Sequence, residues 1–151
     1  MTPIKRRDVL RISGGVAVSL TLLPKSAWAD EPAMRKSIRD MFGDKPIQDG
    51  RVTLTIPTLS ENGYSVSMNV EVESPMTEND YVTKLAIFSE RNPIPLIAAY
   101  HFTPASGRAR IASNIRLGGT QNVHAIAQMS DGSLWRASAK TFVTLAACVV
   151  L

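Results

Sequence analysis

The sequence predicts an all-β fold: an immunoglobulin-like antiparallel β-sandwich with a short N-terminal helix. After Gly50, apolar and polar residues alternate, most regularly over residues 66–72, which is the period of a strand with one solvent-exposed face. Turn-forming residues separate short strand candidates at the spacing typical of a β-sandwich. These candidates are residues 52–56, 66–72, 82–89, 96–102, 109–117, 123–129, 134–137 and 140–145.

The helix is expected directly before the strands. Pro32 suits a first helical position, and apolar residues from Met34 to Phe42 recur at helical spacing. Gly43 is a typical C-terminal cap. Between the first two strands, Glu61-Asn62-Gly63 predicts a turn.

Residues 1–29 have the features of a twin-arginine signal peptide. The segment Arg6-Arg7-Asp8-Val9-Leu10-Arg11 fits that motif, and a moderately apolar stretch covers residues 12–23. This stretch is shorter than the ~20 residues that span a bilayer, which argues against a membrane anchor. Ala27-Trp28-Ala29 supplies the small residues that a signal peptidase needs. We therefore expect cleavage after Ala29 and a periplasmic protein.

The charge balance excludes nucleic acid as a partner. Of 17 basic and 13 acidic residues, five and one lie in residues 1–29, which leaves 12 of each in the remainder. No basic stripe with interleaved aromatic residues is present. Residues 30–145 are long enough for one domain with one core, and residues 146–151 form a C-terminal tail.

Cys148 is the only cysteine, so the chain forms no internal disulfide. Its thiol is then buried, paired with another chain or used chemically, and its place near the end of the sequence favours use. A blue-copper site would need clustered ligands, but His101 and His124 lie 47 and 24 residues before Cys148. We expect His124 to be an ordinary strand residue. We expect no metal or cofactor, and no hydrolase motif indicates an enzyme.

From Asp49 onward, the sequence resembles the SoxY family, the sulfur-carrying subunits of the periplasmic thiosulfate-oxidising Sox system. The blocks that carry this resemblance are Ser60-Glu61-Asn62-Gly63, Ser74-Pro75-Met76-Thr77-Glu78-Asn79-Asp80-Tyr81-Val82, Glu90-Arg91-Asn92-Pro93, His101-Phe102-Thr103-Pro104-Ala105-Ser106-Gly107-Arg108-Ala109, Ile115-Arg116-Leu117, Thr120-Gln121-Asn122-Val123, Ser130-Asp131-Gly132 and Trp135.

The resemblance implies an immunoglobulin-like sandwich that pairs with a second small β-protein, SoxZ. It also implies that Cys148 is the covalent attachment point for sulfur intermediates. In the family, a haem enzyme couples thiosulfate to this cysteine, a hydrolase removes sulfate, and further enzymes process the remaining sulfur. The carrier itself catalyses nothing.

The tail differs from the family pattern, which ends in Gly-Gly-Cys-Gly-Gly. Here the sequence reads Leu145-Ala146-Ala147-Cys148-Val149-Val150-Leu151, which is bulkier and favours an extended conformation. Full extension from Leu145 to Cys148 gives ~10 Å of reach. No Lys, Arg or His lies in residues 141–151, so activation of the thiol is expected from a client enzyme. The alternative is a SoxY-like binding or structural subunit whose tail is docked and carries no sulfur.

Overall fold

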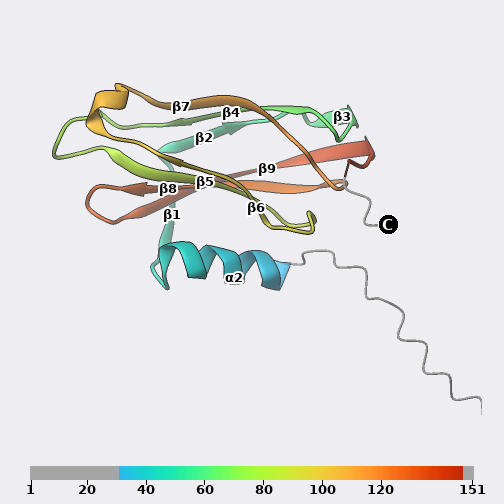
Figure 1. The fold of residues 1–151 in the computed structure, drawn as a ribbon, viewed down its shortest axis with the longest axis horizontal. Helices are drawn as coiled ribbons and strands as arrows, with labels where there is room; N and C mark the ends of the chain where they lie inside the picture. The colour runs from blue at the N-terminus through green and yellow to red at the C-terminus, as the bar shows by residue number, and fades with distance from the viewer. Residues whose placement is uncertain (1–30, 148–151) are drawn as a thin grey trace, which may run out of the picture.

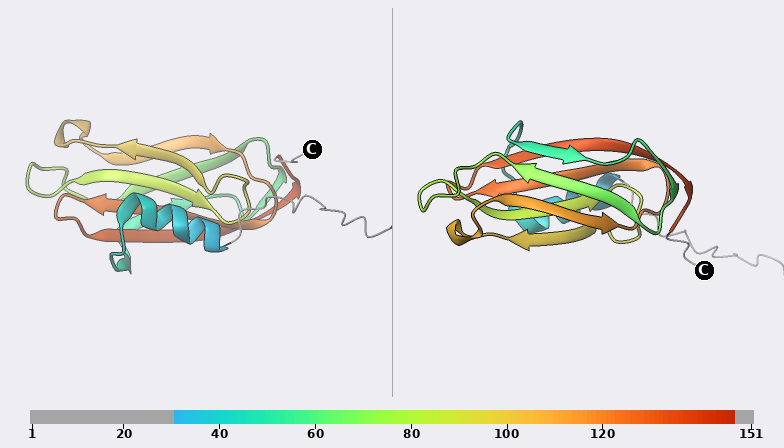
Figure 2. Two further views of the ribbon diagram at one scale, coloured as in Figure 1. Left: turned by 60° about the horizontal axis from the view of Figure 1, so that its bottom comes forward. Right: turned by 90° about the horizontal axis from the view of Figure 1, so that it is seen from above.

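The computed structural model describes residues 31–147, which form two β-sheets stacked face to face, with one helix on the outside of the larger sheet (Figures 1 and 2). The larger sheet has the strand order β1-β9-β8-β5-β6, with β3 also paired to β9, and the smaller has the order β2-β4-β7. The strands are β1 (Ile47–Asp49), β2 (Val52–Thr55), β3 (Leu59–Asn62), β4 (Val66–Val72), β5 (Val82–Ser89), β6 (Leu96–His101), β7 (Ala109–Ile115), β8 (Gln121–Met129) and β9 (Leu134–Leu145). The predicted sandwich is confirmed.

The predicted helix is also confirmed, as α2 (Glu31–Phe42). Gly43 ends it with a left-handed backbone (φ 77°), and its amide donates to the carbonyl of Arg39 at 2.8 Å. A short 3₁₀ turn, η1 (Pro104–Ser106), joins β6 to β7. In the described part of the chain, no helix is long and apolar enough to cross a membrane.

Two predictions of strand boundaries are wrong. Residues 134–137 and 140–145 belong to a single strand, β9, because the intervening residues continue the pairing with β8 from Leu134 to Thr141. Glu61 and Asn62 belong to β3 rather than to a turn, because β3 pairs with the end of β9; the turn begins at Gly63. The pairings of β1 and β3 with β9 are parallel, whereas the remaining pairings are antiparallel.

The core has two layers. Between the sheets, β4 contributes every second residue, which explains its regular alternation. On the other face of the larger sheet, α2 places Met34 and Phe42 against Phe88 and Ile126. Strand β5 is therefore buried on both faces and is apolar along most of its length.

The two ends of the sandwich carry different connections. β3, the last residues of β9, the β5–β6 loop and the β7–β8 loop lie at one end, on the right in Figure 1. The β4–β5 connection, η1 and the β8–β9 turn lie at the opposite end. The chain leaves the described structure after Ala147, at the first of these ends.

Candidate functional site

Cys148, the predicted sulfur attachment residue, lies outside the described residues. The structure describes the chain up to Ala147, which is the residue covalently next to it. The surroundings of Ala147 therefore define the place where the cysteine leaves the fold.

Ala147 is held by hydrogen bonds between backbone groups. Its amide donates to the carbonyl of Leu117 at 3.0 Å. The amide of Leu117 donates to the carbonyl of Gly63 at 2.9 Å, and the amide of Gly63 donates to the carbonyl of Leu145 at 2.8 Å. These four residues, Gly63, Leu117, Leu145 and Ala147, are called the tail anchor below.

Gly63 lies where three chain segments meet. A Cβ atom at this position would lie 2.5 Å from the carbonyl oxygen of Leu117, 2.9 Å from that of Leu145 and 3.0 Å from the amide nitrogen of Ala147. All three neighbours are backbone atoms, which cannot move aside as a flexible side chain can. The absent side chain thus permits the close approach of the tail to the fold.

The end of β9 is fixed on both sides before it reaches the tail anchor. The amide of Phe142 donates to the carbonyl of Thr58 at 2.8 Å, and the hydroxyl of Thr144 donates to the carbonyl of Glu61 at 2.9 Å. The amide of Val143 donates to the hydroxyl of Thr120 at 3.0 Å. The tail therefore begins from a strand that is ordered on both edges.

A buried amide pair holds the β7–β8 loop, which supplies Leu117. The side chain of Asn92 donates to the carbonyl of Arg116 at 2.8 Å and accepts from the amide of Gly118 at 2.8 Å. Gln121 donates to the same Asn92 oxygen at 3.1 Å. Asn92 thus fixes the residues on either side of Leu117. Four blocks that carry the family resemblance meet at this end of the sandwich: residues 60–63, 90–93, 115–117 and 120–123.

The structure ties the start of the tail to the fold. The expected reach of ~10 Å was counted from Leu145, but Ala147 is itself hydrogen-bonded to the fold. The residue that directly precedes Cys148 is therefore fixed. Sequence reasoning missed this because the contacts join backbone groups of segments that are distant in the sequence, and no residue type in the tail signals them.

The surface around the tail anchor is apolar in part. Tyr64 and Leu145 are about half exposed, at 49% and 58%, and the paired residues Leu59 and Phe142 are 60% and 46% exposed. Arg116, next to Leu117 in the β7–β8 loop, is exposed as well. It is a cation from a neighbouring loop, whereas residues 141–151 contain none.

His124 is a satisfied strand residue, as expected. Its Nε2 lies 3.0 Å from Oε1 of Glu90. The Glu90 carboxylate also accepts from the side-chain amide of Asn122, and its Oε2 accepts from the backbone amide of Asn122. Burial raises the pKa of Glu90, but the hydrogen bonds from Asn122 and His124 together outweigh it and lower the pKa below the ordinary value of 4.5. This cluster borders a pocket of about 310 Å³ between α2 and the larger sheet.

The structure does not bring the two histidines together. His101 pairs with Lys84 and His124 pairs with Phe88, on opposite sides of β5. Among residues 31–147, no group of three His, Cys, Asp or Glu side chains is arranged to hold a metal ion.

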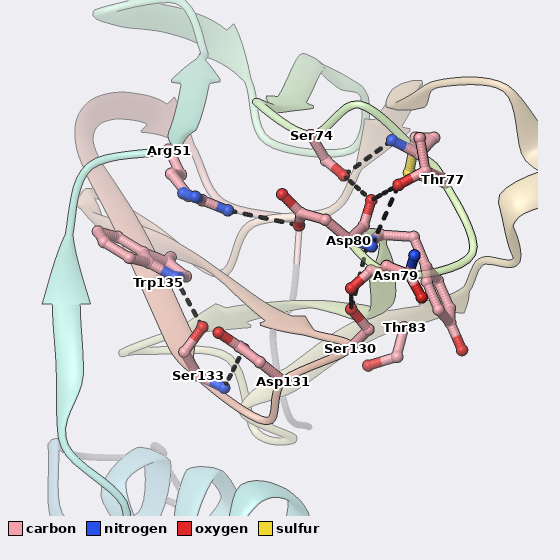
Figure 3. A network of polar contacts seen from close by, with 12 residues as sticks. Arg51, Ser74, Thr77, Asn79, Asp80, Thr83, Ser130, Asp131, Ser133 and Trp135 are labelled. Carbon is pink, nitrogen blue, oxygen red and sulfur yellow. Dashed lines mark hydrogen bonds and ion pairs between the residues drawn. The ribbon is translucent and has the colours of Figure 1, made fainter.

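The opposite end of the sandwich contains a separate polar network (Figure 3). The guanidinium of Arg51 lies 5.3 Å from the centre of the Trp135 ring and 3.7 Å from the Asp80 carboxylate. Ser74 and Thr77 hold the β4–β5 connection through hydrogen bonds to Asp80. This network contains further blocks of the resemblance, but it is at the far end of the molecule from Ala147.

The comparisons with known proteins agree with the fold and with the resemblance. The family described as "Sulfur oxidation protein SoxY" matches residues 38–148. The solved structure of the sulfur carrier protein SoxY from Chlorobium limicola f. thiosulfatophilum is 26% identical and covers 74% of this chain and 96% of that chain, with a TM-score of 0.63. No curated protein matches the sequence significantly.

More distant structures share the sandwich alone. A superoxide reductase (neelaredoxin) from Ignicoccus hospitalis is 15% identical over 61% of this chain and 78% of that chain, with a TM-score of 0.55. A superoxide reductase from Nanoarchaeum equitans is 14% identical over 63% of this chain and 99% of that chain, with a TM-score of 0.52. At these identities the likeness concerns the immunoglobulin-like fold.

Proposed function

The chain belongs to the SoxY family of sulfur oxidation proteins, and we propose that it carries sulfur intermediates covalently on Cys148 and presents them to partner enzymes. The observation that carries this proposal is the extent of the family match, which runs to residue 148 and so includes the cysteine. The similar solved protein from Chlorobium limicola f. thiosulfatophilum is a sulfur carrier. As in the family, the chain acts as a carrier and the chemistry is catalysed by its partners.

The chemistry suits a single thiol near the end of the sequence. In loading, the sulfur of Cys148 forms an S–S bond with the outer sulfur of thiosulfate; the pair loses two electrons to the haem enzyme, and the thiol proton goes to water. Hydrolysis then releases sulfate and leaves a persulfide on Cys148. A cysteine thiolate is nucleophilic and its S–S bonds exchange reversibly, which both steps require.

The proposed partners follow from the family. We expect a heterodimer with a SoxZ-like small β-protein, and sulfur-oxidising enzymes that dock where the tail leaves the fold. Residues 1–29 fit export by the twin-arginine route, and SoxY proteins are periplasmic, so we place the mature protein in the periplasm. We propose no membrane partner.

A second candidate function is a SoxY-like binding or structural subunit that carries no sulfur. The observation that favours it is the hydrogen bond at Ala147, which ties the tail to the fold directly before the cysteine. Three apolar residues, Val149, Val150 and Leu151, follow the thiol and suit a docked tail.

Intact-mass analysis separates the two functions. The mature protein, copurified with its SoxZ-like partner, is incubated with thiosulfate and the oxidising haem enzyme. Carriage predicts that the wild type gains the mass of one thiosulfate, that a reductant removes it, and that a Cys148→Ser variant gains nothing. A wild-type thiol that gains no adduct and resists alkylation until the protein is unfolded would refute carriage and support the docked subunit.

A further inference from the structure

We propose that Gly63 is a positioning residue: by accepting and donating backbone hydrogen bonds with no side chain in the way, it sets the point where Cys148 leaves the fold. This inference rests on the proposed function for its biological purpose, but the geometry concerns only described residues. Gly63 joins Leu117 to Leu145, and Leu117 holds Ala147.

The backbone around Gly63 leaves no room for a side chain. The Ala147 amide nitrogen, which donates to the carbonyl of Leu117, lies 3.0 Å from the place of a Cβ on Gly63, so a side chain there would press on it. An alanine at position 63 would also meet two carbonyl oxygens, at 2.5 and 2.9 Å. Gly63 has no left-handed backbone that would itself demand glycine. The close approach of three backbone segments, the tail among them, is therefore the reason for a glycine at this position.

The tail anchor is itself held in place by further hydrogen bonds. Asn92 holds the carbonyl of Arg116 and the amide of Gly118, so Leu117 cannot shift without breaking buried hydrogen bonds. On the other side, Leu145 is fixed by the pairing of β9 with Asn62 of β3. Both partners of Gly63 thus belong to ordered segments.

The consequence is a short tether. The Cα of Cys148 lies 3.8 Å from that of Ala147 by covalent geometry, roughly a third of the reach counted from Leu145. An enzyme that receives the thiol must then approach the body of this protein, and Tyr64 and Leu145 are exposed beside the exit. We infer that this surface contacts the enzymes that act on Cys148.

Hydrogen exchange tests the anchor in the full mature chain with its partner. We expect the Ala147 amide of the wild type to exchange roughly tenfold more slowly than in an unstructured peptide, as local hydrogen bonding requires. Gly63→Ala should abolish that protection. Ser65→Ala, an exposed change two residues away, is the matched control and should preserve it.

The alkylation rate of Cys148 gives a second measurement, which would not change if these contacts served only the stability of the fold. Ala147→Pro removes the donated amide and leaves Gly63 intact, so it should raise the native alkylation rate of Cys148 about fivefold, the change expected from one hydrogen bond of typical net strength.

A spin label on Cys148, paired with one on an Ala112→Cys site in β7, should give a narrow distance distribution when the rest of the chain is wild type. Insertion of two glycines after Ala147 should broaden it while Ala147 stays protected.

The proposal is overturned if the wild-type Ala147 amide exchanges at the unstructured rate. It is also overturned if Gly63→Ala folds and leaves both the exchange and the label distances unchanged. If Gly63→Ala does not fold, the alkylation rate of Cys148 in Ala147→Pro decides: a faster rate than in the wild type supports the anchor, and an unchanged rate overturns it. Failure of the proposed function looks different: the wild type would gain no thiosulfate mass although Ala147 is protected.

Discussion

Replacement of Asn92 by alanine tests the buried support of the tail anchor. Asn92 is 7% exposed, and its side chain makes three hydrogen bonds, with Arg116, Gly118 and Gln121. Asn92→Ala leaves one carbonyl oxygen and two N–H donors without these partners in a poorly hydrated site. At about 1 kcal/mol for each lost bond, the free energy of unfolding should fall by about 3 kcal/mol.

Urea unfolding followed by circular dichroism measures this loss, and the melting temperature should fall by roughly 10 °C for a domain of this size. Asn114→Ala is the matched control, because Asn114 is exposed on β7 and should change the stability by less than about 0.5 kcal/mol. Since Asn92 holds the residues beside Leu117, the native alkylation of Cys148 should also become faster. A loss below about 1 kcal/mol would refute the reasoning, because it would mean that water replaces the amide at little cost.

Three further substitutions test other parts of the structure. Because the pKa of Glu90 is lowered in the fold, its ionised form stabilises the protein above pH 4.5, the ordinary pKa value. This stabilisation is lost as the pH falls through the lowered pKa. In acid titrations, the difference in unfolding free energy between wild type and Glu90→Gln should therefore shrink below pH 4.5. Phe42→Ala removes the ring that lies edge-on to Phe88 at 6.4 Å, and should cost about 3 kcal/mol in urea unfolding and expose the α2 amides to hydrogen exchange; unchanged α2 protection would contradict this packing. The Thr141 hydroxyl is buried without a hydrogen-bond partner among residues 31–147, so Thr141→Val should stabilise the protein by about 1 kcal/mol, whereas a loss of stability would indicate a bound water.

The sequence predicted the elements whose residues are patterned by burial. Apolar and polar residues alternate along β4 because one of its faces is exposed to solvent. Helix α2 has an apolar face because it packs on the larger sheet. Strand β3 was missed because its residues are mostly exposed, and only pairing with β9 makes them a strand. β1 was missed for the same reason, since its three residues pair with Leu134 to Arg136 far along the chain.

The sequence predicted the reactive residue of the candidate site but not the contacts that hold the tail. Cys148 was found because it is the only thiol, and a reactive residue type can be recognised from the sequence alone. The tail anchor was not, because its contacts are made by backbone amides and carbonyls that every residue possesses. The only signal for it in the sequence was Gly63, which the turn interpretation had already explained.

A short tether changes what a partner enzyme can recognise. A long flexible tail can enter a channel while the carrier body stays distant, but each residue that becomes ordered costs about 1–2 kcal/mol of conformational entropy. Here that cost is already met up to Ala147 by the tail anchor. Under the proposed function, a receiving enzyme would gain affinity from contact with the body, where Tyr64 and Leu145 are exposed beside Ala147. We therefore expect client specificity to depend on this surface as much as on the tail. Tyr64→Ala should weaken the transfer of sulfur to an enzyme without changing the alkylation rate of the free thiol.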